Sequence, residues 1–485
     1  MATSKQAAHG LFWSTLERVA TQGISFVVVL LLAKLLGPHS YGLVTLAATI
    51  ALLGQMLLGE TFSQALIQEK TIEPAHTSSL FWLLAGFGLL ATGGQYVCAD
   101  EIAKIFDQPA LAPILRALSP LFLLTGLQAV PAALFKRELN FRALAAASTF
   151  GTLLGGAVGL ALAFTGFGIW SLVANLLVQN TIVTVTIWRK SEFFPALEFS
   201  RSHLHGLWSY GQYTLLLRIA AFTANQSPRL IVGYLFGPAA LGAFSLGLRI
   251  VEILYQLLVI PATNVMVPMI ARIRETPDRL VKAILDATQL VAMIAVPVYV
   301  ALAITAPIVI PMFFGEQWLA SVLLVQILSV YGVIGSCGLI WQSIVGGLGR
   351  PDIALRTTVL AAITSVAVLF LAARWGLTAA AVAFVLRGYI TLPFMPIVLA
   401  RLTGIPAARQ YRALVPIAAA ALIMAVTISA SMAEFDGKIA PILILVFALI
   451  SGGIAYGVAL LVFARPAIQR GFAILGHLQP GKNLA

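Results

Sequence analysis

Residues 36–42 read Leu-Gly-Pro-His-Ser-Tyr-Gly and separate two apolar segments, each long enough to cross a membrane. Proline cannot continue a helix and glycine tolerates a positive φ, so this stretch ends one helix and begins the next. The Gly-Pro-x-x-x-Gly pattern returns 200 residues later, at Gly237. Nine of the 33 positions from 14 to 46 equal the residue 200 positions further on, with Arg18 and Arg218 among them. The sequence therefore predicts two repeats.

The composition indicates a membrane protein. The chain has 485 residues, of which 60% are hydrophobic and 10% charged, and its mean hydropathy is +0.96. Soluble domains carry about 25% charged residues. Because apolar runs of about 20 residues recur along the whole chain, we expect an all-α polytopic protein. The fourteen spans predicted lie near 11–35, 41–66, 76–98, 110–134, 143–165, 167–188, 206–233, 240–268, 281–305, 318–345, 353–373, 376–400, 412–432 and 440–464.

The distribution of basic residues predicts the orientation. With both termini in the cytoplasm, 20 of the 30 Lys and Arg residues fall in cytoplasmic segments and four in outer loops, as the positive-inside rule requires. The net charge of +12 then reflects the basic residues of the cytoplasmic segments, which contact anionic lipids. It does not indicate binding of nucleic acid.

The repeat and the topology together predict the domain organisation. Six spans separate the two copies of the turn, so both repeats run in the same direction and are related by an axis along the membrane normal. We expect an N-terminal six-helix bundle over 1–200 and a C-terminal six-helix bundle over 201–404. Residues 405–485 would then supply two additional transmembrane helices and a cytoplasmic tail.

Each repeat begins with a helix that carries one narrow polar face. Ser14, Arg18 and Ser25 are spaced i, i+4 and i+11, and Thr214, Arg218 and Asn225 take the same places in the second copy. A polar face inside a membrane must look at a cavity or a partner. We expect Arg18 and Arg218 to bind substrate; alternatively, Arg18 neutralises Glu60.

Other polar or charged side chains within the predicted spans are candidates for substrate binding or ion coupling, because such side chains inside a membrane face a cavity or a partner. Arg249 and Arg387 could bind substrate, although Arg249 is spaced i, i+3 from Glu252 and could form a local ion pair. Glu17, Glu60 and Glu252 are the candidates for proton or sodium coupling. Polar amides could hydrogen-bond sugars or join helices; they are Asn175, Gln179, Asn180, Asn225, Gln226, Gln256, Asn264 and Gln342.

The sequence lacks the signatures of enzyme chemistry. It contains no Gly-x-x-x-x-Gly-Lys-Ser/Thr loop, and no spacing of histidines or of its two cysteines is typical of a metal site. The connections between spans are too short to house a catalytic domain. We therefore expect a transporter that uses no cofactor.

Several stretches resemble a known family. They are residues 31–42, the sequence Ala-Leu-Ile-Gln-Glu-Lys at 65–70, Phe-Lys-Arg-Glu-Leu-Asn-Phe at 135–141 and Phe-Phe-Gly-Glu-Gln-Trp at 313–318. In order and spacing they resemble the Wzx-type polysaccharide exporters of the multidrug/oligosaccharidyl-lipid/polysaccharide (MOP) superfamily. The chain departs from the family pattern at 226–228, where Gln-Ser-Pro replaces the more usual Asn/Asp pair.

The resemblance implies a MATE-like fold in the bacterial inner membrane. It also implies flipping of undecaprenyl-pyrophosphate-linked repeat units, for exopolysaccharide or lipopolysaccharide synthesis, by alternating access. The implied partners are the lipid-linked oligosaccharide, membrane lipids and the polymerase and export machinery. A drug antiporter on the same fold, a lipid II flippase and a membrane-bound glycosyltransferase or polymerase are the alternatives. The antiporter would need an acidic cavity, and the enzyme a long outer loop.

Overall fold

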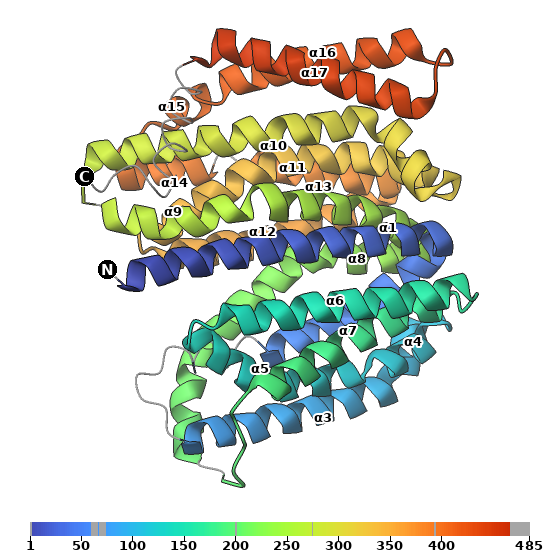
Figure 1. The fold of residues 1–485 in the computed structure, drawn as a ribbon, viewed down its shortest axis with the longest axis vertical. Coiled ribbons are helices and arrows are strands. Elements are labelled where there is room, and N and C mark those ends of the chain that lie inside the picture. The colour runs from blue at the N-terminus through green and yellow to red at the C-terminus, as the bar shows by residue number, and fades with distance from the viewer. Residues whose placement is uncertain are drawn as a thin grey trace. The chain divides into compact units, whose positions relative to one another are not determined.

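The protein is helical throughout the part that the computed structural model describes, which comprises residues 2–59, 66, 74–198, 201–273, 275–391 and 394–465. Within these ranges every regular element is a helix (Figure 1). Twelve of the described helices are long and apolar enough to cross a membrane. The predicted class, an all-α polytopic membrane protein, is confirmed.

Two of these helices each contain two of the predicted spans. α1 (Ala2–Gly59) and α8 (Arg201–Leu258) are both 58 residues long. A straight helix of that length would measure about 87 Å, against about 30 Å for the hydrocarbon core of a bilayer. Both leave the helical region at the repeated glycine, with φ 77° at Gly37 and φ 79° at Gly237. When each broken helix is counted as two arms, the twelve helices correspond to the fourteen predicted spans.

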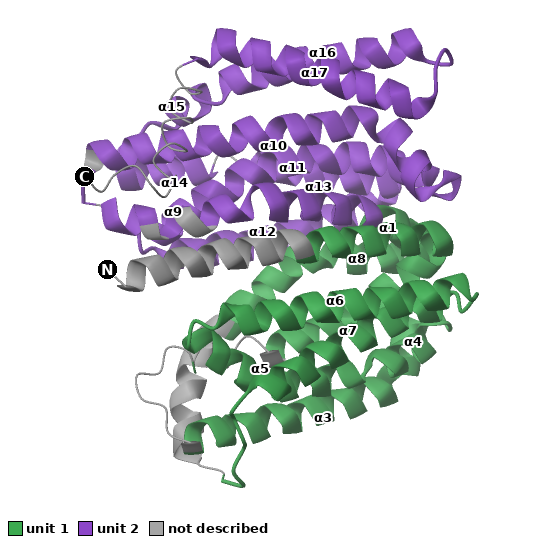
Figure 2. Cartoon of the chain, in the orientation of Figure 1, with its two compact units in different colours: residues 1–245 green, residues 246–485 purple. Residues whose placement is uncertain are grey.

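The chain divides into two compact units, residues 1–245 and 246–485 (Figure 2). The first contains α1, the part of α8 up to residue 245, α3 (Pro74–Ile105), α4 (Leu111–Leu118), α5 (Pro120–Arg137), α6 (Phe141–Phe164) and α7 (Ile169–Lys190). The boundaries at 200 and 404 expected from the repeat stay a prediction.

Small residues set the packing of α6 on α7, which form an extensive contact. Gly151, Gly155 and Gly159 recur every four residues on one side of α6. A Cβ atom on Gly151 would lie 2.8 Å from the carbonyl oxygen of Gln179, and one on Gly155 equally close to that of Asn175. Glycines at this spacing let two helix backbones approach closely, as is common between helices in membranes.

The segment that follows α7 is fixed to α3. Trp82 donates a hydrogen bond from Nε1 to the carbonyl of Ala196 at 2.9 Å, and the backbone N–H of Ala196 donates to the Ser78 hydroxyl at 3.0 Å. Phe81 contacts the rings of Trp188 and Phe193 edge-on. Aromatic side chains of α3, α7 and the segment after α7 therefore pack together at this end of the first unit.

The second unit is built around α10 (Pro277–Phe314) and α11 (Leu319–Gly347), which pack along each other. The other elements are the part of α8 from residue 246 on, α9 (Ile260–Ile273), η1 (Glu316–Trp318), α12 (Pro351–Ala372), η2 (Ala373–Trp375), α13 (Leu377–Thr391), α14 (Phe394–Thr403), α15 (Ala407–Arg412), α16 (Val415–Phe435) and α17 (Pro441–Phe463). The last two form a hairpin that packs on α10, where the Tyr456 hydroxyl donates to the carbonyl of Met293 at 2.9 Å.

The two Gly-Pro turns meet inside the first unit. A Cβ atom built on Gly42 would collide with the carbonyl oxygen of Pro238, and a Cβ atom on Gly242 would collide with that of Pro38. The contact is reciprocal, so the turns are related by a local two-fold axis that passes between them. The sequence repeat is therefore also a structural repeat at this point.

Candidate functional site

A cavity of about 720 Å³ lies within the first unit. Five helices line it, namely α1, α5, α6, α7 and α8. The lining residues of α5 extend to Lys136, next to the last residue of the helix, while those of α6 are Leu144 and Ser148 near its start. The cavity therefore lies near the end of the unit where α5 connects to α6, and three basic residues, Lys136, Arg137 and Arg142, flank that connection.

The polar lining is dominated by carboxamides. Gln55 projects from α1 and Gln128 from α5, and Asn225 and Gln226 come from α8. Asn225 donates a hydrogen bond from Nδ2 to the carbonyl of Ala221 at 2.8 Å, which leaves its Oδ1 as an acceptor. Carboxamides both donate and accept hydrogen bonds, so they suit the hydroxyl groups of a sugar.

Neighbouring residues hold two of these amides. The Gln226 Oε1 accepts a hydrogen bond of 2.7 Å from Nη1 of Arg229, a buried side chain on the next turn of α8. The hydroxyl of Thr184 lies 3.5 Å from Oε1 of Gln128 and donates to the carbonyl of Asn180 at 2.8 Å. Gln226 is therefore oriented by a cation, whereas the contact between Gln128 and Thr184 is long.

One cation and no carboxylate belong to the described lining of this cavity, and the cation is Lys136. Arg218 is half-buried on α8, three residues before Ala221 and seven before Asn225. Because residues spaced i, i+3 and i+7 share a face of a helix, Arg218 continues the cavity-lining face by one turn. The cavity thus suits a neutral or anionic ligand better than a cation.

Two further predicted substrate ligands, Arg249 and Arg387, belong to the second unit. The buried Arg387 donates from Nη1 to the carbonyl of Ala361 on α12 at 2.7 Å, and its guanidinium lies 4.9 Å from the centre of the Phe384 ring. Arg249 and Glu252 are both half-buried on α8. Binding of substrate by Arg249 and Arg387 stays a prediction.

Three predicted residues cannot be placed. The side chains of Glu17 and Arg18 lie outside the described residues, and so does the whole of Glu60. Their predicted roles in ion coupling and substrate binding, and the alternative pairing of Arg18 with Glu60, remain predictions.

Sequence reasoning did not identify Gln55, Gln128 or Lys136 as candidate ligands. Lys136 is one of the basic residues assigned to the cytoplasmic segments, and that assignment predicts orientation and not binding. A signal for the two glutamines existed, because each is an uncharged polar residue within an apolar span. Their spans, at 41–66 and 110–134, are not adjacent in sequence, so spacing alone could not show that the two side chains line one cavity.

The fold is shared with solved membrane transporters. Solved structures of MOP-superfamily transporters share it. The inward closed conformation of the lipid II flippase MurJ aligns with a TM-score of 0.80 at 15% identity, covering 95% of this chain and 100% of that one. The inward-facing conformation of a multidrug resistance MATE family transporter aligns with a TM-score of 0.62 at 16% identity, covering 80% of this chain and 98% of that one. The predicted MATE-like architecture is confirmed.

The chain belongs to the polysaccharide biosynthesis protein family, whose profile matches residues 31–323. It is 29% identical over 315 residues to the succinoglycan biosynthesis transport protein ExoT of Rhizobium meliloti (strain 1021). That match covers 65% of this chain and 64% of the relative, slightly under two thirds of its length. It is also 23% identical over 365 residues to the lipopolysaccharide biosynthesis protein WzxC of Escherichia coli (strain K12), covering 74% of this chain and 73% of that protein. The predicted resemblance to Wzx-type exporters is confirmed.

Proposed function

We propose that this protein is a flippase for lipid-linked oligosaccharides. It moves undecaprenyl-pyrophosphate-linked repeat units from the inner to the outer leaflet of the bacterial inner membrane, for exopolysaccharide or lipopolysaccharide synthesis. The observation that carries the proposal is the 720 Å³ cavity of the first unit, with its four carboxamides and Lys136. Family membership and the transporter fold support it.

The chemistry of the cavity favours a glycan with an anionic group. Sugar hydroxyls can exchange hydrogen bonds with Gln55, Gln128 and Asn225. Lys136 and Arg218 supply positive charge for the pyrophosphate, and charge-assisted hydrogen bonds to phosphate are the stronger kind. A drug antiporter for cations is disfavoured, because the described lining of this cavity offers a cation no carboxylate.

The placement of the cavity supports loading from the cytoplasm. Its lining residues on α5, α6 and α7 lie toward the helix ends that carry Lys136, Arg142 and Arg189, and basic residues mark the cytoplasmic side. In this orientation both termini are cytoplasmic. The two Gly-Pro turns then lie on the outer side, where their contact keeps the repeats together. Rocking of the repeats would open the outer side and close the inner side.

Transport in this proposal makes and breaks no covalent bond. The pyrophosphate link stays intact while Arg18 and Arg218, equivalent residues of the two repeats, hold it in the inward-open state. Glu17, Glu60 and Glu252 are the proposed sites of proton or sodium coupling. The polymerase and the export machinery are the proposed partners that take over the flipped unit.

Deletion of the gene tests the function in the cell. The expected result is the accumulation of one undecaprenyl-pyrophosphate-linked oligosaccharide in the inner leaflet, identified by mass spectrometry of the lipid extract. Accumulation of lipid II would instead favour the lipid II flippase that shares the fold. An unchanged lipid extract in a strain that still makes all its surface glycans would contradict both assignments.

A further inference from the structure

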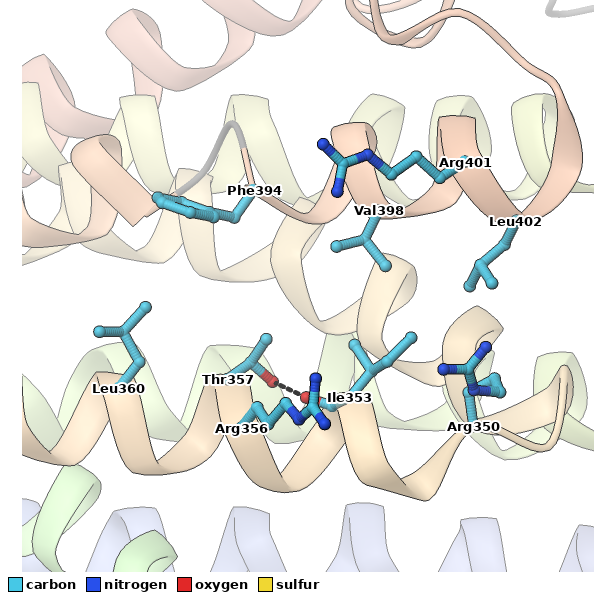
Figure 3. A pocket seen from close by; sticks show the side chains of 9 residues that line it. All are labelled: Arg350, Ile353, Arg356, Thr357, Leu360, Phe394, Val398, Arg401 and Leu402. Atoms are coloured by element: carbon cyan, nitrogen blue, oxygen red, sulfur yellow. Dashed lines mark hydrogen bonds between the residues drawn. The ribbon is translucent and has the colours of Figure 1, made fainter.

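The second unit contains a separate groove of about 420 Å³ between α12 and α14. α12 packs on α13 and α11, and α14 packs on α11 and α15. The groove therefore lies between two helices that both contact α11. Figure 3 shows Val398 of α14 pointing across the groove toward α12. No residue of this groove belongs to the cavity described above.

Three arginines lie along this groove. Arg350 is held by a bidentate ion pair to Asp352, in which Nε and Nη2 each donate at 2.9 Å. That hydrogen-bonded pair raises the pKa of Arg350 above its usual value. Arg356 and Arg401 are exposed, and neither makes an ion pair within the described residues. Two guanidinium groups therefore remain available to an anion.

The groove has a charged end and an apolar end. On α12 the lining begins at Arg350 and ends at Leu360, and on α14 it begins at Phe394 and ends at Leu402 (Figure 3). Because the two helices run in opposite directions, Leu360 and Phe394 lie together at the end away from Arg350. Both are substantially exposed, at 40% and 52%. Arg356 and the guanidinium of Arg401 lie between these two ends (Figure 3). A ligand in the groove would therefore meet positive charge from Arg350 to the middle and hydrocarbon at the end formed by Leu360 and Phe394.

The length of the groove matches one leaflet. Ten residues of helix separate Arg350 from Leu360, or about 15 Å, which is half of a hydrocarbon core of about 30 Å. Arg350 and Arg401 lie just outside the predicted spans 353–373 and 376–400, at ends that the basic-residue distribution assigns to the cytoplasmic side, and Arg356 lies just inside the first of these spans. Arg356, six residues into α12, can extend its side chain toward the interface. The apolar end then reaches about the middle of the bilayer.

We propose that this groove is a binding site for an anionic phospholipid of the cytoplasmic leaflet. Its phosphate is held by Arg356 and Arg401, and one acyl chain lies along Leu360, Phe394 and Val398. Basic pockets between transmembrane helices on the cytoplasmic side are typical sites for anionic head groups. The site is separate from the transport cavity, so it does not depend on the identity of the transported glycan.

Native mass spectrometry of the full-length protein tests the site. The protein is mixed in detergent with palmitoyl-oleoyl phosphatidylglycerol, or with phosphatidylcholine of the same acyl chains. We expect one tightly retained phosphatidylglycerol and no equivalent phosphatidylcholine. Arg356→Ala combined with Arg401→Ala should weaken that binding, roughly fivefold for each arginine. The matched control, Arg189→Ala combined with Arg279→Ala, removes two exposed arginines elsewhere and should leave it unchanged.

Further variants distinguish binding of the lipid head group from binding of the acyl chain. Competitors distinguish a phospholipid from a free anion and from the transported lipid. Arg356→Lys with Arg401→Lys should retain most binding, since lysine still supplies point charges for phosphate. Val398→Trp should weaken binding by filling the groove while the charges remain. Equal loss in the control variant, or equal retention of phosphatidylcholine, would overturn the proposal. Displacement of the lipid by inorganic phosphate or by undecaprenyl pyrophosphate at equal concentration would also overturn it, and would assign the groove to a free anion or to the transported lipid.

Discussion

Gly42 packs directly against the backbone carbonyl of Pro238, at the contact between the two repeated turns. The equivalent glycine of the second turn packs in the same way against the first. A backbone contact of this kind leaves no room for a side chain on either glycine. This contact explains why the second glycine of the Gly-Pro-x-x-x-Gly pattern, Gly42, recurs as Gly242. The first glycine, Gly37, recurs as Gly237 because the chain turns there with a positive φ.

Gly42→Ala should destabilise the protein. The added methyl group would force two backbones apart, and overpacking of this kind costs about 1–3 kcal/mol. The measurement is the melting temperature of the purified protein in detergent. Gly23→Ala is the matched control, because a Cβ atom there has no neighbour within 4 Å. If both substitutions lower the melting temperature equally, the close approach of the turns is not a stabilising contact.

Much of the fold follows from local signals in the sequence, and much of the site does not. The spans and the break at Gly37 could be predicted because hydropathy and the Gly-Pro pair act within one stretch of chain. The partner of Arg387 could not, since its hydrogen bond reaches the carbonyl of Ala361, 26 residues away on another helix. That Gln55 and Gln128 line one cavity could not be predicted either, because tertiary packing brings these two residues together from helices that are not adjacent in sequence.

Arg387→Ala separates a structural role from the predicted role in substrate binding. Loss of a hydrogen bond that involves a charged group costs about 1.5–3 kcal/mol, so we expect a lower melting temperature. Arg387→Lys keeps the charge but not the contact of the guanidinium with the Phe384 ring, and should recover only part of the stability. An unchanged melting temperature together with abolished transport would identify Arg387 as a substrate ligand instead.

Cysteine labelling tests the orientation. In a background without Cys98 and Cys337, a cysteine at the exposed Thr276 should resist a membrane-impermeant thiol reagent in intact cells. A cysteine at the exposed Asp436, in the α16–α17 loop, should react. This pattern is expected because basic residues mark the cytoplasmic side. Rapid labelling at both positions would rule out the fourteen-span topology with cytoplasmic termini.

Reconstituted transport tests the proposed function of the cavity most directly. Purified protein in liposomes should move a fluorescent undecaprenyl-pyrophosphate-linked oligosaccharide between leaflets, and mass spectrometry should find the substrate chemically unchanged. Lys136→Ala and Gln128→Leu should each slow the transfer about tenfold or more, because each removes a hydrogen-bonding partner from the ligand. The control Lys190→Ala removes an exposed lysine outside this cavity and should transport normally. Normal transport by the Lys136 and Gln128 variants, or a substrate with transferred or hydrolysed sugar, would contradict the account.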